Sequence, residues 1–183
     1  MGQLFTYIAD EVLADHSRHD MCPWCETRTE LYRIFIENDD DSCDEACVRC
    51  IKTLPLRWLA PKDDERRISQ LINQRYPKGT KSQDQRFALT VEAADAYRRT
   101  PCLPNFVQGE DWPHCCGDFT EFIGDAGKSG PFAQGPFEAF TWWGDEDDCA
   151  VEEGVEGMMD AEDAVSLFRC RHCEKSYWTF QCT

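Results

Sequence analysis

The sequence predicts an α+β fold in which short strands and two or three helices are organised around cysteine-rich sites. Cysteine doublets of the form Cys-x-x-Cys recur at residues 22–25, 47–50 and 170–173. Short runs of β-forming residues alternate with turns rich in glycine, proline and aromatic side chains. Two further segments place apolar residues at helical spacing.

The first sixty residues contain one predicted strand between two doublets. Residues 1 to about 20 predict a short helical or frayed lead, because apolar side chains share roughly one face there: Ile8, Val12 and Leu13. Residues 31–36 read Leu-Tyr-Arg-Ile-Phe-Ile, which is rich in β-formers.

Two helices follow a linker. Residues 54–61 are apolar and bounded by prolines, as in a linker. A helix starts at Asp63 or Asp64 and runs to Tyr76, where Pro77 stops it. A second helix starts at Thr90, a good N-cap, and Thr100-Pro101 ends it.

The last third of the chain favours short strands and turns. Residues 160–166 form one or two helical turns, and residues 167–169 form a strand that leads into the last doublet. We expect two regions, 1–60 with an N-terminal zinc knuckle and 61–183 with the α+β elements, which can also form one compact domain.

Twelve cysteines occur without a recognisable secretion signal. Acidic residues occupy the positions where such a signal is apolar: Asp10, Glu11 and Asp15. No apolar run reaches the roughly 20 residues that span a bilayer. Because a reducing compartment favours metal binding over disulfides, we expect a cytoplasmic protein that does not associate with membranes.

The formal net charge is −16, from 35 acidic and 19 basic side chains. The segment 138–163 carries many carboxylates and no lysine or arginine. Such a field repels phosphate backbones, so it argues against nucleic-acid binding, and it attracts basic proteins. Tryptophans beside these acids predict a partner-binding segment made of Trp142, Trp143, Asp145, Glu146, Asp147, Asp148, Glu152 and Glu153.

The first two doublets predict a closed zinc site. Two thiolates separated by two residues cover one side of a tetrahedral ion, so two doublets supply four ligands. The proposed ligands are Cys22, Cys25, Cys47 and Cys50. Cys43 is a second-choice substitute because its spacing to Cys47 is less suitable.

The third doublet needs partners for a second zinc site. Cys170 and Cys173 can be completed by the run His114-Cys115-Cys116, and we assign Cys115 and Cys116. The fourth ligand stays open among the three residues of that run, and Cys182 and His172 are further options. The alternative is that Cys115 and Cys116 are buried thiols that pack as small hydrophobes.

Several catalytic motifs are incomplete. The run Gly124-Asp125-Ala126-Gly127-Lys128-Ser129 ends like a phosphate-binding loop, but Phe122 stands where that motif requires glycine. The zinc-deaminase signature is incomplete, because the His-x-Glu element at His172-Cys173-Glu174 is not followed by Pro-Cys-x-x-Cys. His-Glu-x-x-His and Gly-x-Ser-x-Gly are missing. The sequence therefore favours a protein without catalytic activity.

Ordered blocks across residues 22–178 resemble the CbrC family of bacterial colicin-tolerance proteins. The blocks are Cys47-Val48-Arg49-Cys50-Ile51, Arg99-Thr100-Pro101, Trp112-Pro113-His114-Cys115-Cys116-Gly117-Asp118-Phe119, and Leu167-Phe168-Arg169-Cys170-Arg171-His172-Cys173-Glu174-Lys175. That family has glycine where Glu174 stands here. The resemblance implies a zinc framework and a link to tolerance of a nuclease colicin.

Three functions are compatible with these features. The first is an acidic, zinc-stabilised immunity protein that neutralises a basic toxin domain, since nuclease toxins need a basic surface. The alternative is a zinc-ribbon adaptor in stress response or transcription. A metal-dependent hydrolase with Asp118 as base is the third.

Overall fold

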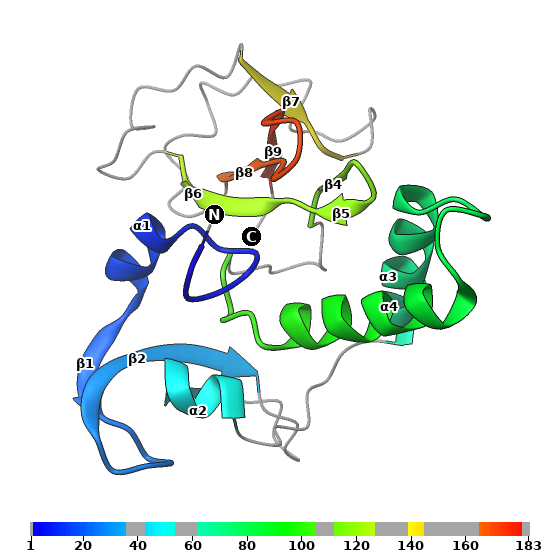
Figure 1. Ribbon diagram of the computed structural model, residues 1–183. Helices are drawn as coiled ribbons and strands as arrows, with labels where there is room; N and C mark the ends of the chain where they lie inside the picture. Colours follow the sequence, from blue (N-terminus) through cyan, green and yellow to red (C-terminus); the bar gives the residue numbers. More distant parts are fainter. Residues whose placement is uncertain are drawn as a thin grey trace. The chain divides into compact units, whose positions relative to one another are not determined.

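The computed structural model confirms the α+β prediction (Figure 1). It describes residues 2–35, 43–53, 62–104, 112–126, 139–144 and 165–180. Within these residues, nine short strands and four α-helices form two units, Met1–Cys102 and Leu103–Thr183. The sequence predicts a boundary between two regions at residue 60 and a linker at residues 54–61. Both fall outside the described residues.

The N-terminal lead, predicted to be short helical or frayed, is helical over residues 10–16 and not over residues 2–9 before them. Helix α1 covers Asp10–Leu13, a 3-10 turn follows at Ala14–His16, and strand β1 begins at Arg18. The Asp10 carboxylate accepts hydrogen bonds from the backbone N–H groups of Gln3 and Leu4, 2.8–3.0 Å away. These bonds hold residues 3–10 in a loop rather than a helix, and the loop buries Phe5, Tyr7 and Ile8.

A three-stranded antiparallel sheet carries the first two cysteine doublets. Its order is β1 (Arg18–Met21), β2 (Arg28–Phe35), β3 (Cys43–Cys47), which confirms the predicted strand at 31–36 and extends it toward the N-terminus. Leu31 of β2 pairs with Cys47 of β3. Helix α2 (Val48–Thr53), which we did not predict, starts directly after β3 and buries Ile51.

Helices α3 (Lys62–Arg75) and α4 (Gln83–Arg98) contact each other in unit 1. The first confirms its prediction, with Ile68, Leu71 and Ile72 buried. The second starts seven residues before Thr90, because Ser82 and Gln85 form a capping box that we had missed. Thr90 lies inside the helix, where its hydroxyl donates to the Arg86 carbonyl oxygen over 3.0 Å.

Replacement of the capping serine should destabilise unit 1. The Ser82 hydroxyl accepts from the Gln85 N–H at 3.2 Å, and the Gln85 side chain accepts from the Ser82 N–H at 2.9 Å. Ser82→Ala should therefore lower the free energy of unfolding by about 1 kcal/mol in denaturant titrations. The control is Ser69→Ala inside α3, where alanine is the better helix former and stability should not fall.

Unit 2 contains a four-stranded sheet and a small hairpin. The sheet order is β6 (Glu121–Asp125), β8 (Val165–Arg169), β9 (Ser176–Phe180), β7 (Phe140–Trp142), with β7 parallel to β9 and the other pairs antiparallel. The hairpin joins β4 (His114–Cys115) to β5 (Asp118–Phe119). The strand predicted at 167–169 is confirmed as part of β8. Of the predicted helical turns at 160–166, residues 165 and 166 are in this strand, and 160–164 lie outside the described residues.

Both faces of β8 are buried from Val165 to Phe168, and Arg169 at the end of the strand is exposed. On one face, Val165 and Leu167 pack with Ala126 and Trp178. On the other face, the Phe168 ring lies 5.5 Å from that of Trp112 and 5.6 Å from that of Phe122. The packed sheet therefore fixes the turn between β8 and β9, where the third cysteine doublet lies. No helix in the described part of the chain has the length and apolar character needed to cross a membrane.

Candidate metal centres

Centre one gathers the four predicted cysteines of unit 1. Cys22 and Cys25 lie in the turn between β1 and β2, Cys47 ends β3, and Cys50 lies in α2. All four Sγ atoms lie within 4.8 Å of one another. The Cys22–Cys50 distance is 3.9 Å and the Cys25–Cys47 distance is 3.7 Å. A zinc ion with four Zn–S bonds of about 2.3 Å sets sulfurs about 3.8 Å apart, so this cluster fits such an ion.

Centre two gathers the four predicted cysteines of unit 2. Cys170 and Cys173 lie in the β8–β9 turn, and Cys115 and Cys116 lie at the tip of the β4–β5 hairpin. The Cys115 sulfur is 3.8 Å from that of Cys116 and 3.6 Å from that of Cys173. These lengths again match the edges of a tetrahedron around a zinc-sized ion. The cluster at centre two consists of four sulfurs, so each of its four residues could offer a sulfur to a metal, and His114 is not in the cluster.

Cys115 and Cys116 are adjacent in the sequence, and both reach centre two because the backbone turns sharply at Cys116 and Gly117, just before β5. Cys116 has φ 53° and Gly117 has φ 70°, both in the left-handed region. The sequence could have indicated this turn, because glycine follows the pair and tolerates that conformation. The His114 ring instead lies 4.6 Å from the Trp143 ring, edge to face.

The first and third doublets have the same local geometry. The Cys22 N–H donates to the Thr27 carbonyl oxygen (2.9 Å), and the Glu26 N–H donates to the Cys22 carbonyl oxygen (2.8 Å). In centre two, the Cys170 N–H donates to Lys175 (2.8 Å) and the Glu174 N–H donates to Cys170 (3.0 Å). These paired bonds form knuckles whose cysteine sulfurs point to one side.

Within each centre, the pKa of one cysteine is lowered and the pKa of another is raised. Thr27, through its hydroxyl and its N–H, lowers the pKa of Cys25 to about 6. The N–H of Lys175 lowers the pKa of Cys173 to about 7. Burial raises the pKa of Cys50, and hydrogen bonding with Cys173 raises the pKa of Cys116 to about 12. A metal must displace protons from the high-pKa thiols, so binding at both centres should weaken as the pH falls.

The nine cysteines whose side chains are described form no disulfide with one another, and eight of them make up the two centres. Each centre could hold a metal ion such as zinc. The sequence pattern of the uncharacterised protein family UPF0167 matches residues 3–182. The chain belongs to this family. No curated protein and no solved structure matches it.

In this UPF0167 protein, a non-glycine residue occupies a left-handed position in each knuckle. Glu26 has φ 55° and Glu174 has φ 61°, immediately after the last cysteine of each doublet. Left-handed backbone costs residues with a Cβ atom roughly 1–2 kcal/mol. The glycine that the resemblance places at position 174 is therefore explained by backbone geometry.

The change Glu174→Gly should stabilise this UPF0167 chain. We expect the free energy of unfolding to rise by about 0.5–1 kcal/mol, because relief of the left-handed strain exceeds the entropy that glycine adds to the unfolded chain. Denaturant titration of the metal-loaded protein measures this. Glu92→Gly inside α4 is the matched control and should lower stability by about 1 kcal/mol. Equal effects at both positions would contradict the prediction.

Asp118 connects the two hairpins that carry centre two. It is buried, and the Nε2–H of His172 donates to its Oδ2 over 2.8 Å. The guanidinium of Arg171 lies 3.8 Å from the same oxygen. His172 also lies within the third doublet, where its backbone N–H donates to the Cys170 sulfur over 3.4 Å. Asp118 therefore orients the knuckle relative to β5 in this UPF0167 protein.

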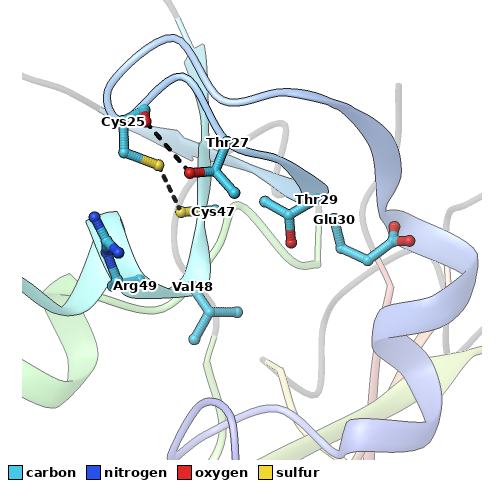
Figure 2. Close-up of a pocket in the computed structure, with 7 residues that line it drawn as sticks. All are labelled: Cys25, Thr27, Thr29, Glu30, Cys47, Val48 and Arg49. Carbon is cyan, nitrogen blue, oxygen red and sulfur yellow. Dashed lines mark hydrogen bonds between the residues drawn. The ribbon is translucent and has the colours of Figure 1, made fainter.

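A shallow open pocket lies beside centre one (Figure 2). The side chains of Cys25 and Cys47 point toward each other at one side of it. The remaining lining residues are Thr27, Thr29, Glu30, Val48 and Arg49. One edge of centre one therefore meets solvent through this pocket.

The predicted partner-binding segment lies mainly outside the described residues, which omit Asp145, Glu146, Asp147, Asp148, Glu152 and Glu153. Its two tryptophans are half-buried and pack within unit 2. The Trp142 ring lies 4.3 Å from that of Trp178, and the Trp143 ring lies 5.6 Å from that of Tyr177. These contacts use part of both rings for packing within unit 2.

Proposed function

We propose that the two centres are structural zinc sites. Thiolate ligands in tetrahedral sets select zinc among the common divalent ions of a reducing compartment. The grouping of eight cysteine sulfurs into two sets of four supports this proposal. A zinc ion at either centre would be held by sulfur alone, and each doublet would supply half of its ligands.

The same donor sets argue against catalysis. A catalytic zinc usually keeps one position for water or substrate, whereas four cysteines fill all four positions. The carboxylate considered as a base, Asp118, is engaged by His172 and Arg171. We therefore propose a cytoplasmic, non-catalytic protein whose metals stabilise its fold.

The net charge of −16 carries the proposal about its partner. An acidic surface accelerates the association of a basic protein and disfavours nucleic acid. A nuclease-type toxin must expose a basic surface for phosphate groups. Together with the resemblance to the CbrC colicin-tolerance family, this charge favours an immunity or tolerance protein that neutralises a basic toxin domain.

An affinity capture from host lysate tests this function. We expect a basic protein held in stoichiometric amount at low salt and released at high salt, because screening weakens charge attraction between exposed groups. Mass spectrometry identifies the captured protein. Recovery of only abundant housekeeping proteins, with no dependence on salt, would contradict the proposal.

Charge reversal of the acidic segment gives a sharper result. Replacing Asp145, Glu146, Asp147 and Asp148 together with lysine should reduce the association rate at low salt by about tenfold or more, because rim charges act mainly on encounter. The control replaces the same four residues with asparagine or glutamine, which should give a smaller loss. Unchanged binding by the lysine variant would remove this segment from the interface.

A further inference from the structure

The two centres differ in how far their sulfur ligands are exposed. In centre one, Cys22, Cys47 and Cys50 are buried, and Cys25 is half-buried. In centre two, by contrast, Cys116 and Cys173 are exposed, Cys115 is half-buried, and only Cys170 of the four is buried. Solvent and small reagents therefore meet two ligand residues of centre two directly.

The fold explains this difference. Centre one is covered by the first turn of α2, and its partly open edge is the Cys25–Cys47 side that lines the pocket in Figure 2. Centre two lies between the tips of two hairpins, and hairpin tips project from the sheet that supports them. Its ligands Cys116 and Cys173 are consequently on the solvent side.

The surroundings of centre two also suit thiolate chemistry. Cationic or protonatable side chains flank the exposed ligand Cys173, with His172 before it and Lys175 two residues after it. Thiolates that are exposed and close to basic groups are the ones that react with oxidants. The Lys175 ammonium stays near the knuckle, since it lies 5.2 Å from the centre of the Tyr177 ring.

The geometry also indicates which second sulfur would complete a disulfide. The Cys115 sulfur is 3.6 Å from the Cys173 sulfur. It is also 3.8 Å from the Cys116 sulfur, but adjacent Cα atoms are about 3.8 Å apart, below the roughly 4.4 Å at which disulfides usually begin. Cys115 is therefore better placed to join Cys173 than to join its neighbour.

We infer that centre two is a hydroperoxide-reactive thiolate site, with Cys173 as the attacking residue and Cys115 as the resolving residue. This inference rests on the proposed zinc binding. The Cys173 sulfur attacks one peroxide oxygen, the O–O bond breaks, and a sulfenic acid forms while water or an alcohol leaves. The Cys115 thiolate then attacks the Cys173 sulfur, forms the S–S bond and expels the oxygen as water. Two electrons pass from the sulfurs to the peroxide, and two protons come from solvent. Cys173 and Cys115 would then no longer be available to hold a zinc ion.

Zinc release on treatment with hydrogen peroxide tests this inference. The full-length protein is loaded with zinc, its metal content is measured, and a chromogenic zinc chelator then follows release. We expect one of the two zinc ions to leave about tenfold or more faster than the other, because exposed thiolates oxidise selectively. Peptide mapping after the fast phase should find a Cys115–Cys173 disulfide, and a dithiol reductant with added zinc should restore the original metal content.

Several outcomes would overturn the inference without touching the proposed function. These are release of both ions at the same rate, first oxidation at Cys25 and Cys47, or a Cys116–Cys173 disulfide in place of the expected one. A protein that holds no zinc before peroxide is added would instead refute the proposed function. The variant Cys102→Ser removes a half-buried thiol outside both centres, and it should leave the fast phase unchanged.

Discussion

Removal of the metal should unfold most of this protein. Structural zinc in small cysteine sites contributes an apparent free energy of about 10–16 kcal/mol, which equals or exceeds the roughly 5–15 kcal/mol that stabilises a typical domain. Each centre also joins segments that are distant in sequence, such as Cys115 and Cys173. A strong chelator with a phosphine reductant should therefore abolish the near-ultraviolet circular dichroism of the tryptophans, and re-addition of zinc should restore it.

Single-ligand variants provide the control for this result. Cys50→Ser in centre one and Cys170→Ser in centre two should each reduce the bound zinc from two ions to one. Cys170→Ser should reduce the near-ultraviolet circular dichroism of the tryptophans more than Cys50→Ser does. The reason is that four tryptophans lie in unit 2: Trp112, Trp142, Trp143 and Trp178. If metal analysis shows that the zinc is gone and the spectrum is unchanged, the centres do not have a structural role.

Truncation of Phe168 should have the second-largest effect. Its side chain is 0% exposed and packs between Trp112 and Phe122 on one face of β8. Phe168→Ala should lower the free energy of unfolding by about 3–5 kcal/mol, because it removes buried surface and leaves a cavity. Denaturant titration of the zinc-loaded protein, followed by tryptophan fluorescence, measures the loss.

The same substitution at an exposed phenylalanine is the matched control. Phe87 on α4 is 70% exposed, so Phe87→Ala should change the free energy of unfolding by no more than about 0.5 kcal/mol. Comparable losses at the two positions would mean that the packing of β8 contributes little to stability.

The sequence alone predicted the four cysteines of centre one and the doublet Cys170 and Cys173 of centre two. The spacing of a Cys-x-x-Cys doublet is local information, since two residues between cysteines suffice to turn both sulfurs toward one ion. The helix α3 and the strands β2 and β8 could likewise be predicted, because apolar periodicity and proline positions are read within one segment. The capping box of α4 is equally local, because Ser82 and Gln85 are three residues apart, whereas the predicted start at Thr90 rested on N-cap preference alone.

Only the tertiary structure decided how the ligands are shared and exposed. The choice of Cys116 over His114 depends on a left-handed turn at the hairpin tip, which brings two adjacent sulfurs to one point. The loop of residues 3–10 depends on bonds from Asp10 to backbone several residues away. The different exposure of the two centres depends on α2 covering one and on hairpin tips presenting the other. These features depend on how backbone and side chains meet in three dimensions, which the spacing and periodicity of a single segment do not specify.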